Sequence, residues 1–383
     1  MGLRYERGNR KATNGPMVFF SILRDEVFEE EIRSAYVSGL SFYAYRFPKD
    51  SMMSYGSSED YIEGIGVPGF VIGRFNPELP LVTIPYRNKV ASDFSKEMSC
   101  IEGTRYKMPE KSTTREEYSN EVTEIIKAIK DGRGEKVVAA RVIVKETDFD
   151  IADKFYQLCQ RFPDAFVFCF STPITGCWIG ASPELLLEGR EGQLKTMALA
   201  GTRVAGQDGE WDSKNIEEQE IVVRYLEEVF RKTGLEPEIG ERYTKKAGGV
   251  EHLCTEVIAQ PSQKCNLQRL SEQKNPYLTI EKDKDCFTFE NLIKDLSPTP
   301  ALCGYPKVFG MEEIKKLENF DRGCYGGFCG PFHTSYDFTF HVVLRCASLS
   351  EKRQCIYVGG GITAKSIVSP EWDETTMKAA SLF

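Results

Sequence analysis

Apolar positions that recur every three to four residues predict helices in several segments of the chain. The clearest helix begins after Thr114, which forms a capping box with Glu117, and ends at Gly132. Its apolar face consists of Tyr118, Val122, Ile125, Ile126 and Ile129. The same spacing predicts helices near residues 25–38, over 151–161 and over 215–232. A last helix is expected to open with Ser369 as N-cap and Pro370 at its first position.

Short apolar runs between turn residues predict strands at 137–144, 165–170, several more through residue 199, 338–349 and 354–358. Residues 1–107 read as short strands and turns around one helix. The glycine-rich stretch 62–73 is interpreted as a bent strand pair, because no helical pattern follows it as a phosphate loop would require. Strands outnumber helices and lie in adjacent runs, which favours an α+β fold with antiparallel sheets.

The chain has 383 residues, of which 41% are apolar, enough for a large core. A polar stretch at 107–114 suggests a division into an N-terminal part, 1–110, and a part 111–383, within one compact domain. The formal net charge of -8 argues against a nucleic-acid surface. No apolar run reaches the ~18 residues of a membrane span, and no apolar segment follows the start as in a secretory signal. We therefore expect a cytoplasmic protein without nucleic-acid or membrane partners.

Twelve cysteines are spread over the chain without a CxxC pair, and there are three histidines. This spacing fits no common zinc site, so we expect buried free thiols in a reducing compartment.

Two blocks rich in glycine and proline stand out, at 296–307 (Leu-Ser-Pro-Thr-Pro-Ala-Leu-Cys-Gly-Tyr-Pro-Lys) and 321–330 (Asp-Arg-Gly-Cys-Tyr-Gly-Gly-Phe-Cys-Gly). Such density indicates loops shaped around a small molecule. The sequences of both blocks resemble those of the chorismate-utilising enzymes, the family of isochorismate, salicylate, anthranilate and aminodeoxychorismate synthases. The resemblance covers about residues 111–383 and lies nearest to the isochorismate synthases. It implies two large packed antiparallel sheets flanked by outer helices, as in anthranilate synthase component I.

The resemblance also assigns proton-transfer roles. Lys136 opens a strand, where a lysine is normally solvated; in the family this lysine is the general base that activates water. Glu184 ends a Gly-Ala-Ser-Pro-Glu motif, whose glutamate is the general acid. His252 matches a family histidine near the substrate ring, although a lone histidine would otherwise be read as structural. Ala200 stands where aminodeoxychorismate synthases carry a nucleophilic lysine, which favours water as the nucleophile.

A magnesium site is implied by acids on two helices. Glu218 lies four residues before the apolar Val222 and so faces inward, although it could simply lie near the positive end of its helix dipole. Glu371, Glu374 and Lys378 share one face of the last helix, which alone would read as a solvated face. In the family, the residues matching Glu218 and Glu374 bind Mg²⁺ and that matching Glu371 assists, partly through water.

The residues that the resemblance assigns to substrate binding are Gly201, Thr202, Ala301, Leu302, Tyr325, Arg345, Gly359, Gly360 and Lys378. Arg345 and Tyr325 would hold the enolpyruvyl carboxylate, although an arginine in a strand is more often part of a salt bridge. The glycines after the strand 354–358 would present backbone N–H groups, and by themselves they predict a tight turn.

The implied reaction is the Mg²⁺-dependent isomerisation of chorismate to isochorismate, in which water attacks C2 and the C4 hydroxyl leaves. Salicylate synthase, which also eliminates pyruvate, and a non-catalytic chorismate-binding protein are the alternatives. No amidotransferase portion is present, so no obligate amidotransferase subunit is expected. The product could feed menaquinone, siderophore or salicylate synthesis, and neither this choice nor the oligomeric state follows from the sequence.

Overall fold

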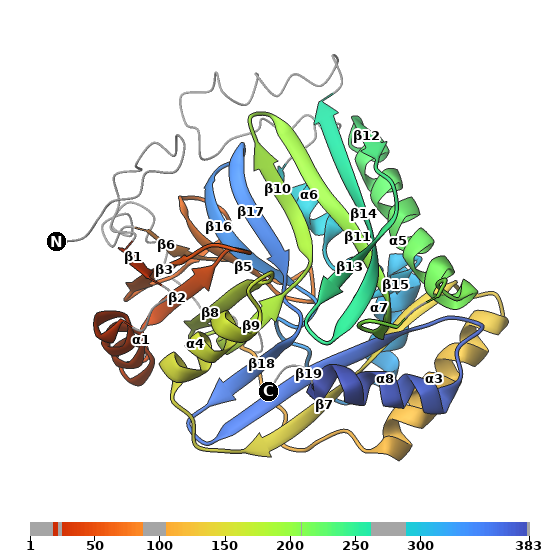
Figure 1. Cartoon of the computed structure of the whole chain (residues 1–383), viewed down its shortest axis with the longest axis horizontal. Coiled ribbons are helices and arrows are strands. Elements are labelled where there is room, and N and C mark those ends of the chain that lie inside the picture. Colours follow the sequence, from red (N-terminus) through yellow and green to blue (C-terminus); the bar gives the residue numbers. More distant parts are fainter. Residues whose placement is uncertain (1–17, 22–24, 87–104, 208, 262–288, 381–383) are drawn as a thin grey trace.

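The computed structural model describes residues 18–21, 25–86, 105–207, 209–261 and 289–380. Within them the strands form two large sheets, and every pair of neighbouring strands is antiparallel (Figure 1). Sheet A has the order β1 (Val18–Ser21), β3 (Met52–Ser58), β2 (Ser41–Arg46), β8 (Phe166–Thr172), β9 (Gly176–Ser182), β18 (Cys346–Ser350), β19 (Arg353–Ile362), β7 (Lys136–Glu146) and β15 (Gly304–Tyr305).

Sheet B has the order β12 (Leu235–Ile239), β14 (Val250–Pro261), β11 (Gln193–Val204), β10 (Leu185–Arg190), β17 (Asp337–Val342), β16 (Phe328–Thr334), β5 (Gly69–Gly73), β6 (Val82–Pro85) and β4 (Ile62–Glu63), and β13 (Tyr243–Ala247) also pairs with β14. The main core contains side chains from both sheets, including Tyr43, Phe70, Phe168, Trp178, Phe328 and Phe340. Strands from residues 18–86 enter both sheets, so the N-terminal part is built into the same core.

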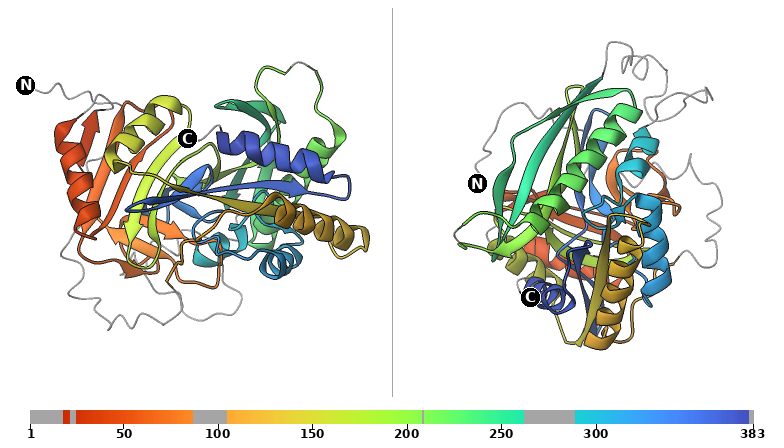
Figure 2. Two further views of the ribbon diagram at one scale, coloured as in Figure 1. Left: turned by 90° about the horizontal axis from the view of Figure 1, so that it is seen from below. Right: turned by 90° about the vertical axis from the view of Figure 1, so that its right-hand side faces the viewer.

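The helices lie around the sheets (Figures 1 and 2). They are α1 (Glu26–Val37), α3 (Arg115–Lys130), α4 (Ile151–Arg161), α5 (Ser213–Lys232), α6 (Phe289–Leu296), α7 (Lys307–Leu317) and α8 (Val368–Ala380). Helices α1 and α4 pack together on the β2–β8–β9 side of sheet A, α3 and α8 pack on β7 and β19, and α5 packs on β11, β12 and β14. The expected α+β architecture is thus confirmed. No described helix is long and apolar enough to cross a lipid bilayer.

Most predicted helices are confirmed, and of the two predicted N-caps, Thr114 is confirmed and Ser369 is not. Asp25 caps α1, the Thr114–Glu117 capping box opens α3, and α4 spans the predicted residues. The last helix starts earlier than expected, at Val368, so Pro370 lies in its first turn, where a missing N–H costs nothing. Ser369 is not the N-cap; its hydroxyl accepts a hydrogen bond from Arg115 Nη2 at 3.1 Å.

Three strand predictions were wrong in detail. The run 338–349 is not one strand: β17 belongs to sheet B and β18 to sheet A, and the chain crosses between the sheets at 343–345. The strand expected at 354–358 continues through the glycines to Ile362 as β19, so these glycines form no turn. The pieces β4 and β5 of the stretch 62–73 do not pair with each other; both pair with β6.

The nine cysteines in the described residues are all buried and free, as the spacing predicted.

Candidate active site

The candidate site lies where the chain passes twice between the two sheets. One crossing joins β9 to β10 and carries Glu184; the other joins β17 to β18 and carries Arg345. The two crossings lie side by side, because the Ala181 N–H donates to the Arg345 carbonyl at 3.0 Å and the Val342 N–H to the Glu184 carbonyl at 3.1 Å. Sheet switching therefore places both side chains between the sheets, which a pattern along one strand could not reveal.

Lys136 is fully buried at the start of β7, which excludes the solvated position considered from the sequence. Its Nζ lies 3.0 Å from Oε1 of Glu218 on α5. A β-carbon on Gly361 of β19 would overlap Glu218, so the glycine lets the acid reach the lysine. Burial lowers the pKa of Lys136, and the neighbouring Lys214 lowers it further, against the opposing effect of Glu218.

Glu184 is also buried, with 2% of its surface exposed, and its Oε1 has no hydrogen-bond partner in the described part of the chain. Burial raises the pKa of Glu184 to about 8, and the charges of Lys136 and Lys245 partly oppose this. The same cause, burial, thus favours a neutral amine on Lys136 and a protonated carboxyl on Glu184. Opposite shifts of two neighbouring titratable groups are the pattern of an acid–base pair.

Three glutamates from two helices gather beside Lys136. Lys214 on α5 bridges the helices, with its Nζ 3.8 Å from Glu218 Oε2 and 3.0 Å from Glu371 Oε1 on α8. On α8, Lys378 Nζ pairs with Glu374 Oε1 at 2.8 Å. Burial opposes ionisation of Glu218, but Lys136, Lys214 and Lys378 outweigh it and lower its pKa to about 2. Glu218 is therefore a carboxylate at any physiological pH.

These acids fit a hard divalent cation by their chemistry. In the described ranges, no three histidine, cysteine or acidic side chains already converge as a metal centre. However, Oε2 of Glu371 is buried without a hydrogen-bond partner among the described residues. It borders Gly360 together with Oε1 of Glu374, at 3.2 and 3.9 Å from the position of a β-carbon there. Carboxylate oxygens facing a space kept open by glycine are ligands that Mg²⁺ accepts.

His252 and Arg345 form a buried pair. Nδ1 of His252 lies 2.7 Å from the Gly201 carbonyl, and Nε2 lies 2.8 Å from Nη2 of Arg345. Because Arg345 can only donate, Nε2 must accept and Nδ1 carries the proton. Burial, Arg345 and Lys378 lower the pKa of His252 to about 3, so the ring is neutral. This histidine thus orients the guanidinium, whose Nη1 donates to the Ala247 carbonyl at 2.6 Å.

The segment Gly201-Thr202 is a bulge in β11, where its register with β14 shifts. Gly201 has a φ of +73°, and a β-carbon there would lie 3.1 Å from Asn215 Oδ1. The Thr202 N–H donates to the same Asn215 oxygen at 3.0 Å. The bulge therefore brings sheet B against the start of α5, next to Glu218.

The glycines of β19 form a strand edge that faces the site. Gly359 and Gly361 lie opposite Ala140 and Val138 of β7. The N–H groups of Ala140 and Val138 point away from β19, because they donate to Glu318 Oε1 and to the Cys303 carbonyl. In an antiparallel pair, the N–H groups of these two glycines must then also point away from β7. Lys378 Nζ occupies this side, because it donates to the Gly359 carbonyl at 3.0 Å.

The two glycine- and proline-rich blocks meet beside β7. Arg322 is buried and donates to the Leu302 carbonyl at 2.7 Å and to the Val138 carbonyl at 2.8 Å. It also pairs with Glu318. This ties the segment with Ala301 and Leu302 to the strand of Lys136. The hydroxyl of Tyr325 would lie 2.8 Å from a β-carbon on Gly359, so Tyr325 also reaches the glycine edge.

Several residues of this site were not identified from the sequence. Lys214 matches the same family motif as Glu218, one helical turn before it, but the motif assigned it no role. Lys245 donates to the Pro183 carbonyl at 2.8 Å, next to Glu184, but it comes from a distant strand and left no local signal. The periodicity of its helix predicts for Tyr118 only an apolar position.

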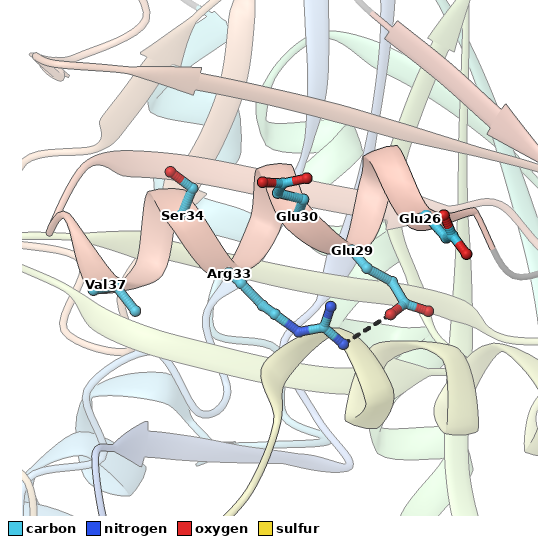
Figure 3. A pocket seen from close by; sticks show the side chains of 6 residues that line it. All are labelled: Glu26, Glu29, Glu30, Arg33, Ser34 and Val37. Atoms are coloured by element: carbon cyan, nitrogen blue, oxygen red, sulfur yellow. Dashed lines mark hydrogen bonds and ion pairs between the residues drawn. The ribbon is translucent and has the colours of Figure 1, made fainter.

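A surface hollow lies elsewhere, along one face of α1 (Figure 3). It is lined by Glu26, Glu29, Glu30, Arg33, Ser34 and Val37, and Arg33 pairs with Glu29 at 2.8 Å. Helix α1 lies at the opposite end of the molecule from α3 (Figures 1 and 2). The hollow therefore forms no part of the candidate site.

Comparison with known proteins identifies relatives along most of the chain. Isochorismate synthase 2 of Arabidopsis thaliana, named as chloroplastic, is 32% identical over 271 residues, 68% of this chain and 45% of that protein. The salicylate biosynthesis isochorismate synthase of Pseudomonas aeruginosa is 28% identical over 285 residues, 70% of this chain and 54% of that protein. The chain thus spans about half the length of these two relatives.

Among solved structures, MenF, the menaquinone-specific isochorismate synthase of Escherichia coli, superposes with a TM-score of 0.72. It is 18% identical, and the match covers 96% of this chain and 94% of that one, which establishes the shared fold. Two family models, both described as chorismate binding enzyme, match residues 86–276 and 282–383. The chain therefore belongs to the family of chorismate-binding enzymes.

Proposed function

We propose that this protein is an isochorismate synthase that converts chorismate to isochorismate with Mg²⁺. The observation that carries the proposal is the buried pair Lys136 and Glu184, each within the electrostatic field of the other and shifted toward its uncharged form. The relatives and the solved structure described above bear the same activity in their names.

The reaction needs one proton removed and one delivered. Lys136, as a neutral amine, takes a proton from the water that attacks C2 of the ring. Glu184, as a protonated carboxyl, delivers its proton to the hydroxyl that leaves C4, and the ring double bonds shift between the two carbons. Ala200 is buried and apolar, so it offers no competing amine nucleophile. Each proton-transfer group contributes on the order of 10²–10⁴ in rate.

The substrate is a dicarboxylate, and the site offers two regions for anions. Arg345, oriented by His252, and Tyr325 would hold the enolpyruvyl carboxylate. The glycine edge of β19, with Gly201 and Thr202 opposite and Ala301 and Leu302 adjoining, would hold the ring. Burial lowers the pKa of Arg345 only to about 10, so its guanidinium keeps its charge at neutral pH.

Glu218 and Glu374 would hold Mg²⁺, with Glu371 assisting. When bound, the cation neutralises the ring carboxylate and polarises the ring. The acids already lie on two helices joined by Lys214, so the protein itself positions both sides of the site. We further propose that the enzyme acts in the cytoplasm on free chorismate, without an amidotransferase subunit or a nucleic-acid or membrane partner.

The test is chromatographic identification of the product from chorismate and MgCl₂, with and without a chelator. Isochorismate formed only with Mg²⁺ supports the proposal. Pyruvate released without a second enzyme would identify a salicylate synthase instead, and binding of chorismate without turnover would identify a non-catalytic binder.

The Lys136→Met variant tests the base directly. We expect it to bind chorismate, because the proposed substrate contacts come from other residues, but to lose about 10²–10⁴ in kcat. Lys145→Met, at the exposed end of the same strand, is the matched control and should retain full activity. Wild-type kcat in Lys136→Met would remove the proposed base.

A further inference from the structure

A buried tyrosine hydroxyl faces the acidic site from a third helix. Tyr118 follows the capping box of α3 and is fully buried. Its hydroxyl has no hydrogen-bond partner in the part of the chain that the structure describes. Buried hydroxyls are almost always hydrogen-bonded, so this one requires an explanation.

The space in front of this hydroxyl is bordered by the acids of α8. A β-carbon on Gly360 would lie 3.5 Å from the Tyr118 hydroxyl, 3.2 Å from Oε2 of Glu371 and 3.9 Å from Oε1 of Glu374. The Glu371 oxygen is likewise buried without a partner among the described residues. The Tyr118 hydroxyl and Oε2 of Glu371, from two helices, thus border the same space without a hydrogen-bond partner among the described residues. Gly360 keeps this space open because it has no side chain.

Packing holds the hydroxyl in this place. The Tyr118 ring meets the Trp372 ring edge-on, with centroids 5.8 Å apart. The Arg141 guanidinium lies over the Trp372 ring, 3.9 Å from its centroid. The first turn of α3 is also tied to α8 by the Arg115–Ser369 hydrogen bond. The hydroxyl and the carboxylates of α8 are therefore fixed relative to each other.

A tyrosine hydroxyl can both donate and accept a hydrogen bond, so it can bind a water molecule in front of the carboxylates of α8. Mg²⁺ keeps several of its water molecules in protein sites, and these waters need polar partners.

We propose that Tyr118 is a positioning residue of the acidic site, whose hydroxyl, with Oε2 of Glu371, binds the water shell of a divalent cation held by Glu218 and Glu374. This inference rests on the cation in the proposed function, but it concerns cation affinity and not the reaction.

The test is calorimetric titration of MgCl₂ into the wild type, Tyr118→Phe and Tyr86→Phe. Tyr118→Phe removes one oxygen and keeps the ring packing. Tyr86 is a matched control, because it is also buried but lies beside His333, with ring centroids 5.2 Å apart, in a contact outside the site. Loss of one hydrogen bond to the cation's water shell should raise the Kd for Mg²⁺ about fivefold in Tyr118→Phe, and less than about twofold in the control.

A wild-type Kd in Tyr118→Phe, or no Mg²⁺ binding by the wild type at millimolar concentrations, would overturn the proposal. A double-mutant cycle with Glu371→Gln provides a second measurement. If the hydroxyl acts through the same water shell as Glu371, the two changes should be non-additive in Kd; additive effects would count against it.

Failure of this inference is distinguishable from failure of the proposed function. Turnover of chorismate by the wild type together with unchanged Mg²⁺ affinity in Tyr118→Phe would remove the role of Tyr118 alone. Weaker Mg²⁺ binding in Tyr118→Phe without any turnover by the wild type would keep that role and remove the proposed reaction.

Discussion

At the scale of single residues, burial determines the chemistry of the site. It lowers the pKa of Lys136 and raises that of Glu184, because in both cases the charged form loses its hydration. Glu218 is buried as deeply, but Lys136, Lys214 and Lys378 lower its pKa. The difference between these two glutamates is thus the number of lysines within reach, a property of neighbours brought together by folding.

The pH dependence of the reaction follows from these shifts. Glu184 must be protonated, so kcat/KM should fall as the pH rises through about 8. Lys245 lowers the pKa of Glu184, and in Lys245→Met the alkaline limb should therefore move to higher pH. Lys246→Met, the exposed neighbour on β13, should leave the limb in place. The measurement is kcat/KM between about pH 6 and 10, and an unmoved limb in Lys245→Met would contradict the assignment of Glu184 as the acid.

At the scale of elements, β7 connects both halves of the site. It carries Lys136 at its start and Arg141 near its middle. Arg141 donates from Nε to Thr375 Oγ1 at 2.8 Å and from Nη2 to Thr376 Oγ1 at 2.9 Å, and it stacks on Trp372. The strand with the base therefore also holds the helix with Glu371 and Glu374.

We predict that Arg141→Lys loosens α8, because a single ammonium cannot make both hydrogen bonds and the stack. The free energy of unfolding should fall by about 1–3 kcal/mol in urea titrations, the usual result of losing buried hydrogen bonds. Binding of Mg²⁺ should weaken as well. Arg224→Lys is the matched control: this arginine lies 4.8 Å from the Tyr305 ring, but its pair with Glu135 is exposed. Equal losses in the two variants would show that the contact with α8 has no special weight.

Helix α3, which packs on β7, also carries a buried acid. Glu121 is buried, its pKa is raised to about 9 by burial and by Glu318, and Arg322 opposes the shift. The folded state thus binds a proton that the unfolded chain releases near pH 4.5, so stability should fall as the pH rises from there to about 9, by at most ~1.4 kcal/mol per pH unit.

Glu121→Gln should remove this loss, because the amide does not ionise. Compared with the wild type, the variant should gain stability steadily between pH 6 and about 9 in urea unfolding experiments. Glu124→Gln, exposed on the same helix, should follow the wild type. Parallel pH profiles for Glu121→Gln and the wild type would show that Glu121 is already ionised in the folded protein.

At the scale of the whole molecule, the site joins parts that are far apart in the chain. Residues near 136, 184, 218, 252, 345 and 374 meet because two sheets pack face to face and the chain crosses between them. A cation between α5 and α8 would link these parts, and a ligand bound only to the folded state stabilises it.

Mg²⁺ should therefore raise the melting temperature. At a concentration of about 100 times the Kd the gain is ~2.7 kcal/mol, which amounts to several degrees for a protein of this size. A chelator should reverse the shift, and Glu218→Gln should abolish it. Glu220→Gln, on the exposed side of α5, should keep it. A shift that persists in Glu218→Gln would place the cation elsewhere.

The sequence by itself determined the local features of this protein. The capping box at Thr114, the inward side of Glu218 and the limits of α4 follow from spacing and hydrogen bonding within a few residues, and the structure agrees. The catalytic, metal-binding and substrate-binding roles were predicted from the resemblance of sequence motifs, and they remain predictions until the variants are measured.

Only the tertiary structure decided which groups meet. The split of 338–349 between two sheets, the strand conformation of the glycines at 359–361, and the approach of Lys214, Lys245 and Tyr118 to the site depend on contacts between distant segments. Apolar periodicity reports which side of an element is buried, but not which element covers it. For that physical reason the directions of the pKa shifts of Lys136 and Glu184 could be derived only after the two sheets were in place.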